Sequence, residues 1–263
     1  NVGVNMSTIR NRMTKLNGGT PISDGPFRNG SMYLTYTNEG MPIGAFWGYK
    51  TDGLIQTQEQ LNAVKRADFQ PNAELGDVLF VDTNGDGKLD SSDRCMIGNP
   101  IPDIIYGINM GMAWKGFDLN LQFGGTIGNQ IFNAMRYYTY FPNDITNKDR
   151  ALMNYWTPNN TNTDIPRLTA TDVNDNDRFS DMYVENGTYF RLRNAQLGYT
   201  LPASLTQRIK LQKVRFYVSG QNLFTISSYS GMDPEVGQSS SLSRGIDYGI
   251  YPQNISFTGG INV

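Results

Sequence analysis

The chain has 263 residues, a formal net charge of −2 and no histidine. The small net charge gives no polyelectrolyte reason to bind nucleic acid, and the lack of histidine excludes Ser-His-Asp, Cys-His and His-zinc chemistry. The single cysteine, Cys95, cannot form an internal disulfide and has no histidine partner for catalysis. Glycine and tyrosine are plentiful, which is typical of β structure with long loops.

The chain opens with the alternation of a β-strand. Apolar residues at Val2, Val4 and Met6 are separated by small or polar residues, and a period of two predicts a strand. Because the alternation begins with the first residues, we expect no signal peptide here. A long segment from Leu16 to Asp103 follows, in which the sequence predicts a short helix from Gln58 to Ala67.

The acidic stretch from Asp82 to Asp93 has the ligand spacing of an EF-hand-type calcium loop. Side-chain oxygens stand at positions 1, 3, 5, 9 and 12 of this stretch, a glycine stands at position 6, and the carbonyl at position 7 completes the set. The expected metal ligands are Asp82, Asn84, Asp86, Lys88 (through its carbonyl), Asp90 and Asp93.

The sequences on either side of this loop decide which kind of metal site it can be. A strand-like run precedes the loop and two prolines follow it, so the paired helices of an EF-hand have no place here. We therefore expect a structural site that takes calcium, with magnesium as the alternative ion. The competing interpretation is a turn that binds nothing, because Asp, Asn and Gly favour turns by themselves.

The segment from Ile104 to Phe123 predicts a long β-hairpin. Large apolar residues occupy every second position up to Trp114, and the alternation resumes at Phe117 after the turn residues Lys115 and Gly116. The intervening positions hold Gly, Asn, Gln and Asp, and aromatic residues cluster where a strand would leave a bilayer. Both features favour a transmembrane β-barrel over a soluble sandwich. The residues expected to face lipid are Ile104, Tyr106, Ile108, Met110, Met112, Leu119 and Leu121, and those expected to face the interior are Asn109, Asp118, Asn120 and Gln122.

A second long segment runs from Gly128 to Val184 and contains a run of aromatic residues. These residues are weak candidates for substrate contact by ring stacking, and contact with a partner protein or packing against each other is the competing interpretation. A second short helix is expected near Asn147 to Trp156. The candidate substrate-binding residues are Tyr137, Tyr138, Tyr140 and Phe141.

The last third of the chain repeats the strand alternation. Strands are predicted from Asn194 to Leu201, from Val214 to Gln221 and from Ile255 to Val263, with a third long segment from Ser227 to Pro252. Short connections therefore alternate with long ones. Short turns on one rim and long loops on the other are expected of an outer-membrane barrel.

Several stretches together resemble the SusC-like TonB-dependent outer-membrane transporters of Bacteroidetes, and specifically the C-terminal part of their barrel. The matching stretches are "PIGAFWGYKTDGLIQTQEQL", "GDVLFVDTNGDGKLDSSDRCMIGNPIPDIIYGINMGMAWKGFDLNLQFGGTIGNQIFN", "YFRLRNAQLGYTLPASL", "VRFYVSGQNLFTISSYSGMDPEV" and "GIDYGIYPQNISFTGGINV". They cover most of the chain in the family's order.

The resemblance implies an all-β fold made of the C-terminal strands of a 22-stranded transmembrane antiparallel β-barrel. Residues 1–263 would all belong to the barrel, with the plug domain absent and the metal loop at 82–93 inside a long extracellular loop at 17–103. The protein would lie in the bacterial outer membrane with its long loops extracellular, and it would not be an enzyme.

The resemblance also implies a function and a set of partners. Such proteins import oligosaccharides, or peptides in some members, with energy from TonB, which would act through the absent N-terminal part. A SusD-like surface lipoprotein closes over the extracellular side, and the other contacts are the rest of the barrel, the plug domain and the lipid bilayer.

Two other classes of protein compete with the transporter. A soluble, calcium-stabilised β module would bind carbohydrate through the aromatic run and Trp156. A glycoside hydrolase would use paired carboxylates, but the 24 acidic residues show no motif that selects a pair.

Overall fold

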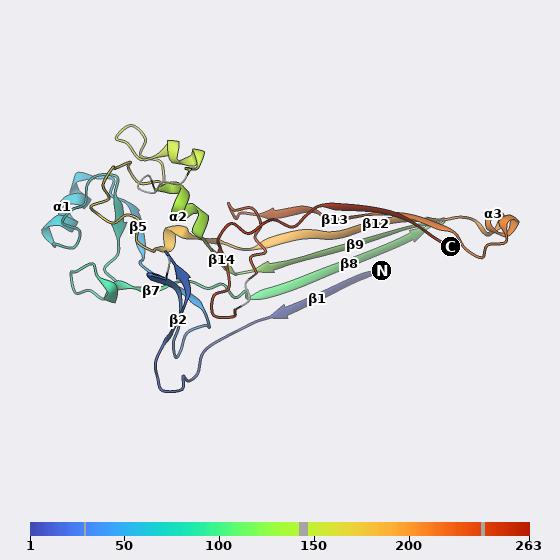
Figure 1. The fold of residues 1–263 in the computed structure, drawn as a ribbon, viewed down its shortest axis with the longest axis horizontal. Helices are drawn as coiled ribbons and strands as arrows, with labels where there is room; N and C mark the ends of the chain where they lie inside the picture. Colours follow the sequence, from blue (N-terminus) through green and yellow to red (C-terminus); the bar gives the residue numbers. More distant parts are fainter. Residues whose placement is uncertain (29, 142–146, 238–239) are drawn as a thin grey trace.

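The computed structural model describes residues 1–28, 30–141, 147–237 and 240–263. Its two parts are a long sheet and an assembly of loops and short elements packed at one end of that sheet (Figure 1). We call the sheet the wall. We call the second part the cap, which is formed by the segments 9–103, 128–188 and 228–255.

The wall is antiparallel and contains, over the described residues, six strands in the order β1-β8-β9-β12-β13-β15. The predicted hairpin is confirmed, and its turn residues Lys115 and Gly116 both have positive φ angles, of 47° and 87°, as a two-residue hairpin turn requires. The strands are β1 (Val2–Thr8), β8 (Ile104–Trp114), β9 (Phe117–Ile127), β12 (Tyr189–Thr200), β13 (Arg215–Ser227) and β15 (Ser256–Asn262).

The register of the wall places the apolar residues of neighbouring strands on one face. Met110 of β8 lies opposite Val2 of β1 and Leu121 of β9, and Leu121 lies opposite Ala195 of β12. A slip of one residue would move a strand's apolar set to the opposite face. The alternation in the sequence therefore fixes the pairing.

The two rims of the wall carry connections of very different length. At the rim away from the cap, β8 and β9 are joined by the two-residue turn, and β12 and β13 by a short connector with α3 (Ala203–Thr206) and η4 (Gln207–Ile209). At the other rim, three long segments enter the cap (Figure 1).

In the part of the chain that the structure describes, no helix has the length and apolar character needed to cross a membrane.

The long segments of the cap fold into small sheets and short helices. A four-stranded sheet has the order β2-β3-β4-β7, a three-stranded sheet the order β11-β10-β14, and a pair is formed by β5 and β6. The strands are β2 (Ile22–Phe27), β3 (Met32–Thr37), β4 (Ala45–Gly48), β5 (Thr51–Leu54), β6 (Val78–Phe80), β7 (Cys95–Gly98), β10 (Gln130–Asn133), β11 (Val184–Asn186) and β14 (Ile246–Asp247). The helices are α1 (Gln58–Arg66), α2 (Ala134–Tyr140), η1 (Ser91–Asp93), η2 (Arg150–Asn154) and η3 (Asp181–Tyr183).

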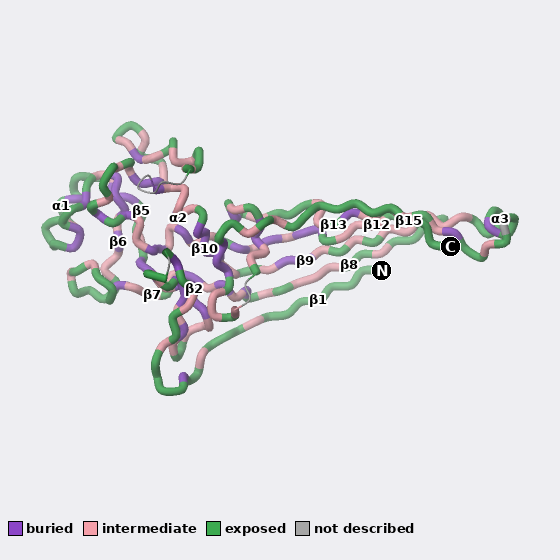
Figure 2. The backbone as a smooth tube through the Cα atoms, in the orientation of Figure 1, coloured by how far each residue is buried: buried purple, intermediate pink, exposed green. Residues whose placement is uncertain are grey.

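The three long segments share one hydrophobic core inside the cap. Phe27 and Phe46 from the first segment pack with Phe132 and Tyr183 from the second and with Ile246 from the third. Figure 2 shows that buried residues gather in the cap, while most of the wall is exposed or half-buried. The cap is therefore held together by protein packing between segments distant in the sequence.

The two predicted cap helices differ in outcome. The first is confirmed as α1, which begins with a capping box between Thr57 and Gln60. The second is confirmed in position, but it is the short 3₁₀ helix η2 and covers only part of the predicted range 147–156. Beyond η2, the backbone N–H of Trp156 donates to the carbonyl of Ile165, and the Trp156 ring enters the core.

Candidate functional site

The two faces of the wall differ in chemistry. The seven residues predicted to face lipid lie on one face, together with apolar side chains from the other four strands. Many of these side chains are exposed, with accessible fractions of 69% for Val4, 60% for Met112 and 60% for Val218. An apolar surface of this extent is a liability in water, whereas it is the expected surface against lipid.

Aromatic residues border this apolar face at both rims. Near the turn between β8 and β9, the rings of Phe117 and Tyr199 lie 4.6 Å apart beside Trp114. Near the cap, the ring of Phe190 lies 5.1 Å from Phe123 and 6.4 Å from both Tyr106 and Phe224. These two aromatic clusters are the girdles of a transmembrane barrel.

The distance between the girdles fits a membrane. Tyr106 and Trp114 are the residues of β8 that belong to the two girdles, and at roughly 3.4 Å per residue they lie about 27 Å apart along the strand. At the tilt of about 40° that barrel strands adopt, this separation gives a band about 20 Å high, close to the ~25 Å apolar band of outer-membrane barrels.

The charged residues of the wall all lie in ion pairs on the inner face. Asp118 of β9 pairs with Arg215 of β13 at N···O distances of 2.5 and 2.8 Å. This pair reaches over Gly198 of the intervening β12, where any Cβ atom would collide with both side chains. Pairing offsets the cost of holding charges in a low-dielectric wall. Over the described strands of the wall, the charged residues are Asp118, Arg191, Arg193 and Arg215.

Two of these arginines, at the cap end of β12, form a group that we call the arginine clamp. Arg191 is buried, and its guanidinium donates to Asp233 at 2.6 Å, to Glu235 at 2.8 Å and to the Thr225 hydroxyl at 2.8 Å. Arg193, next to an irregularity in the register of β12, donates to Glu235 at 3.0 Å. The clamp ties the segment after β13 to the inner face of β12.

The electrostatics of the clamp favour charged partners. Burial opposes ionisation of Asp233, but N–H donors from Gln253 and Glu235, together with Arg191, outweigh it and hold the pKa of Asp233 below its ordinary value of 3.8. The sequence prediction missed this group. The signal for it in the sequence was two arginines separated by one residue in "YFRLRN" and two acidic residues separated by one residue in "MDPEV".

The structure separates the candidate substrate-binding aromatic residues into two pairs. Tyr137 and Phe141 lie in the cap core, with accessible fractions of 5% and 7%. Tyr138 and Tyr140 are half-buried and pack against that core. Since stacking on a ligand needs an exposed ring face, substrate contact stays a prediction for Tyr138 and Tyr140, and the other two are placed to pack the core.

Tyr140 lines a cavity of about 330 Å³ between α2 and the segment that follows β13. The Arg136 guanidinium covers one face of the Tyr140 ring at 4.7 Å and forms an ion pair with Asp164. Asp149 and Asp247 line the same cavity. The cavity thus combines an aromatic ring with charges of both signs.

Trp156 is placed to support the cap from inside. It is 6% exposed, its ring packs against Gly76, and its indole N–H donates to Gln56 at 2.8 Å. Gly76 has a φ of 84°, and a Cβ atom there would collide with the indole ring.

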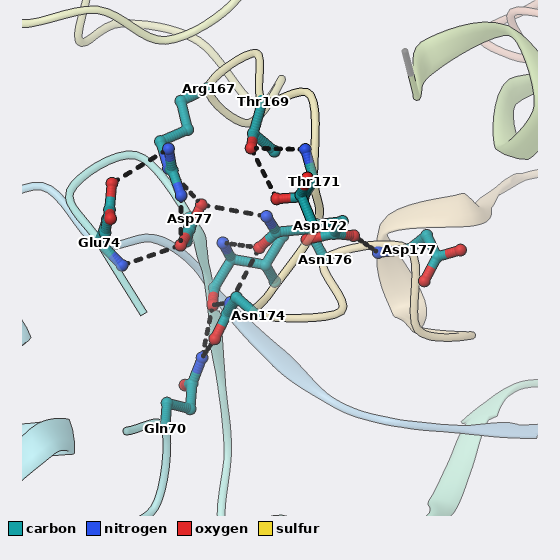
Figure 3. Close-up of polar contacts among 11 residues, drawn as sticks. Gln70, Glu74, Asp77, Arg167, Thr169, Thr171, Asp172, Asn174, Asn176 and Asp177 are labelled. Atoms are coloured by element: carbon teal, nitrogen blue, oxygen red, sulfur yellow. Dashed lines mark hydrogen bonds and ion pairs between the residues drawn. The ribbon is translucent and has the colours of Figure 1, made fainter. Parts of the chain in front are cut away.

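A buried group of polar side chains joins two segments of the cap, as Figure 3 shows. We call it the amide cluster; it consists of Gln70, Asp77, Arg167, Asn174 and Asn176. Asp77 is fully buried and accepts hydrogen bonds from Arg167 at 2.7 Å and from Asn176 at 3.0 Å. Gln70 donates to Asn174 at 3.0 Å.

The amide cluster takes the place of a neighbouring strand beside β6. The backbone N–H of Val78 donates to Asn176 at 2.8 Å, and that of Phe80 donates to Gln70 at 3.0 Å. Buried backbone groups need such partners. The sequence prediction missed this cluster, although the run "DVNDND" at 172–177 is its signal.

The acidic loop at 82–93 is closed by bonds from its own backbone. Both carboxylate oxygens of Asp82 accept N–H groups, from Gly85 and Gly87, and the Gly87 bond holds the pKa of Asp82 below its ordinary value. Asp93 is fully buried and accepts N–H groups from Thr83 and Asp90.

The other acidic side chains of the loop lie at its exposed surface. The Ser92 hydroxyl and N–H donate to Asp90 and lower its pKa, and Asn84 donates to Asp86 at 3.1 Å. Across residues 1–28, 30–141, 147–237 and 240–263, no three Asp, Glu, His or Cys side chains converge closely enough to hold a metal ion.

Taken together, the apolar outer band, the two girdles, the polar inner face and the unequal rims define a segment of a transmembrane β-barrel. No protein-family model matches the chain. Among curated proteins, TonB-dependent receptor P3 of Formosa agariphila is 37% identical over 98% of this chain and 26% of its own length. TonB-dependent receptor SusC of Bacteroides thetaiotaomicron is 27% identical over 98% of this chain and 24% of its own length.

Solved structures agree with these relatives. The structure of the RagAB peptide transporter superposes with a TM-score of 0.74 at 24% identity, and the RagAB peptide importer in its closed-closed state with a TM-score of 0.72 at 26% identity. Each match covers 99% of this chain and 26% of the solved chain. The chain thus spans about a quarter of the length of the proteins that it matches.

The chain belongs to the SusC-like TonB-dependent receptors. These are outer-membrane β-barrel proteins and not enzymes, so the interpretations as a soluble carbohydrate-binding module and as a glycoside hydrolase are wrong. The interpretation as a soluble module failed because the outward apolar face serves a membrane rather than a second sheet.

Proposed function

We propose that this chain forms part of the wall and the outward cap of a TonB-dependent transporter that imports oligosaccharides. A SusD-like lipoprotein would close over the cap, whose long loops would face the cell exterior. The observation that carries the proposal is that the wall has one apolar and one polar face, while a packed cap covers only one of its rims. The plug domain, the TonB contact and the remaining barrel strands would come from the rest of such a transporter.

The chemistry of the inner face supports a neutral substrate. Its charges are neutralised in pairs, as for Asp118 with Arg215, so it offers mostly amide and hydroxyl groups. Such groups exchange hydrogen bonds with sugar hydroxyls and with a plug domain. The amide and hydroxyl residues that share this face include Asn5, Asn109, Asn120, Gln122, Gln196 and Ser219.

Peptide import is the second candidate, and two observations favour it. The solved neighbours are named as a peptide transporter and a peptide importer. In addition, the cavity beside Tyr140 holds Arg136, Asp149 and Asp247, whose opposite charges suit the two termini of a short peptide.

Binding by the purified outer-membrane protein, together with its lipoprotein partner, separates the two candidates. We expect mixed oligosaccharides to bind and short peptides not to bind, and we expect Tyr140→Ala to weaken oligosaccharide binding by about tenfold, the loss of one stacking contact. Exposed Tyr33→Ala, on the cap but away from this cavity, is the control. Binding of peptides alone would favour the second candidate. Uptake of neither class in cells that carry the protein would refute the transport proposal.

We also propose that the loop at 82–93 takes calcium, with magnesium as the alternative ion, as a brace for the cap. The donor chemistry fits, because the ligands at Asp82, Asn84, Asp86, Asp90 and Asp93 are oxygens and hydrogen bonds lower the pKa values of Asp82 and Asp90. Binding would require the Asn84 and Asp86 side chains, which bond each other, to turn inward.

Titration with terbium, a luminescent substitute for calcium, tests the metal proposal. We expect saturable binding that calcium displaces and that the double variant Asp82→Ala, Asp86→Ala abolishes. A double variant at Asp52 and Asp68, which are acidic cap residues outside the loop, is the control. Equal binding by both variants would overturn the proposal.

A further inference from the structure

The outer face of the wall is hollowed over β12 and β13. A groove of about 390 Å³ lies there, and its floor is formed by the small residues Ala195, Gly220 and Gly259. Ala195 pairs directly with Gly220, and Gly259 pairs with Val218 in the next strand. A Cβ atom at Gly259 would have no neighbour nearer than 3.9 Å, so the floor is open at this residue.

Large apolar side chains make the sides of the groove. A shift in the pairing of β12 with β13 accompanies Asn222, which has a φ of 52°. This irregularity brings Leu223 over Gly220, whose missing side chain leaves room for it. Leu197 and Phe257 line the groove as well. The groove is therefore built by the local fold of β13 and is continuous with the apolar band that faces lipid.

Basic residues gather at the rim below this groove, on the side away from the cap. Lys115 lies in the turn between β8 and β9, and Arg208, Lys210 and Lys213 lie in the connector between β12 and β13; all four are exposed. The connector from residue 201 to 214 holds three basic residues and no acidic one, although the chain as a whole has a net charge of −2.

The placement of these two features matches one kind of molecule. The girdle at Phe117 and Tyr199 marks the membrane surface, with the groove on its apolar side and the basic residues on its aqueous side. A phospholipid has its acyl chains on one side of that boundary and its head group on the other. Cations close to a membrane surface attract anionic head groups.

We propose that the groove and the basic rim together bind one anionic phospholipid, with an acyl chain in the groove and the phosphate head group at the basic rim. Because the rim lies opposite the cap, the lipid belongs to the inner leaflet of the outer membrane. That choice of leaflet rests on the outward orientation of the cap in the proposed function, but the lipid site itself does not.

Native mass spectrometry of the outer-membrane protein that carries this chain tests the proposal. The protein is delipidated and then titrated with phosphatidylglycerol or with zwitterionic phosphatidylcholine. We expect one phosphatidylglycerol to be retained in preference to phosphatidylcholine. Each cation removed in Arg208→Gln, Lys210→Gln and Lys213→Gln should weaken retention by about fivefold. Lys65→Gln, in the cap, removes a cation far from the rim and should change nothing.

The groove needs a test of its own, because basic residues alone would attract any anionic surface. Gly259→Leu fills the floor without a collision and should weaken retention by at least about fivefold. Val4→Leu adds apolar volume to the same face of β1 and is the matched control. Heat-modifiable gel migration verifies that each barrel is folded, and Gly259→Val replaces the leucine variant if that one fails to fold. Equal retention by the Gly259 variant and the parent, or no preference for phosphatidylglycerol, would overturn the proposal.

Transport can be measured on the same variants. A loss of lipid retention with unchanged uptake would support the lipid site and leave the proposed function intact. If the parent protein binds the lipid but supports no uptake, the transport proposal is refuted and the lipid site is not.

Discussion

Phe257 in the wall is 79% exposed, whereas Phe132 in the cap is fully buried. Both occupy strands of an all-β protein, and both sit among apolar neighbours. The wall turns such residues outward and leaves its polar side chains inside, and the cap does the reverse. The same residue type therefore faces lipid in the wall and is buried away from water in the cap.

The backbone of the two regions differs in the same way. Each interior wall strand finds its hydrogen-bond partners in two neighbouring strands, as the membrane requires. In the cap, side chains replace missing strands, as Asn176 and Gln70 do beside β6. Such replacement is possible where water covers the outside, and it allows the cap to be irregular.

The largest expected effect contrasts the two phenylalanines. Phe132→Ala removes a ring that packs against Phe179 at 4.6 Å and against Phe27 and Phe46 at 6.2 Å, and should lower the free energy of unfolding of the cap by about 3–5 kcal/mol. Phe257→Ala should cost about 1 kcal/mol or less, because lipid fills the space. Denaturant unfolding measures both, followed by limited proteolysis of the cap for Phe132→Ala and by heat-modifiable gel migration of the barrel for Phe257→Ala. Equal costs would contradict the contrast.

Breaking a buried ion pair in the cap should lower the free energy of unfolding nearly as much as removing a core side chain. Asp77→Ala leaves Arg167 without its buried partner and should destabilise the cap by about 3 kcal/mol. Glu74 pairs with the same arginine at 3.1 Å, but its side chain is 61% exposed. Glu74→Ala is therefore the matched control and should cost about 0–1 kcal/mol in the same unfolding measurement.

The wall was predictable from the sequence because its signal is local. Period-two alternation, the turn at Lys115 and Gly116 and the aromatic girdles all lie within single hairpins. The predicted start of β12 at Asn194 is five residues late, since β12 begins at Tyr189. The arginines of the clamp interrupt the alternation there. Their charges are stabilised in the strand by Asp233 and Glu235, which lie in a distant segment.

The cap was not predictable in the same way because its partners are distant in the sequence. Phe132 pairs with Ile246, and Gln70 bonds Asn174, more than a hundred residues away in each case. No local pattern identifies such contacts. Substrate contact by the aromatic run stays a prediction, and the burial of Tyr137 and Phe141 depends on the rest of the core. The helix α1 was predicted because its residue pattern is local to residues 58–67.

A single charge on each face of β8 tests the orientation of the wall. Met110→Arg places a cation on the apolar face at mid-depth and should cost about 2–4 kcal/mol. Asn109→Arg places it on the inner face one residue away and should be tolerated. The fraction of folded, heat-modifiable protein in outer membranes measures both. If Met110→Arg folds and Asn109→Arg does not, the assignment of the lipid-facing and inner faces is wrong.

The smallest expected effect is a pH dependence at the arginine clamp, where wall and cap meet. The folded pKa of Asp233 lies below its unfolded value of 3.8, so the clamp's contribution is fully present above that value and is lost as the pH falls through the folded pKa. Inside the cap, burial raises the pKa of Asp172, so acid favours that region's folded state between the unfolded and folded pKa values.

Hydrogen–deuterium exchange between pH 7 and pH 3, corrected for intrinsic rates, should therefore show the segment 228–255 opening before the rest of the cap. Asp233→Asn should remove most of this acid dependence, because the substituted side chain cannot titrate. Simultaneous opening of the whole cap in the parent protein would mean that the clamp belongs to the cap core and is not a separate tie between the two regions.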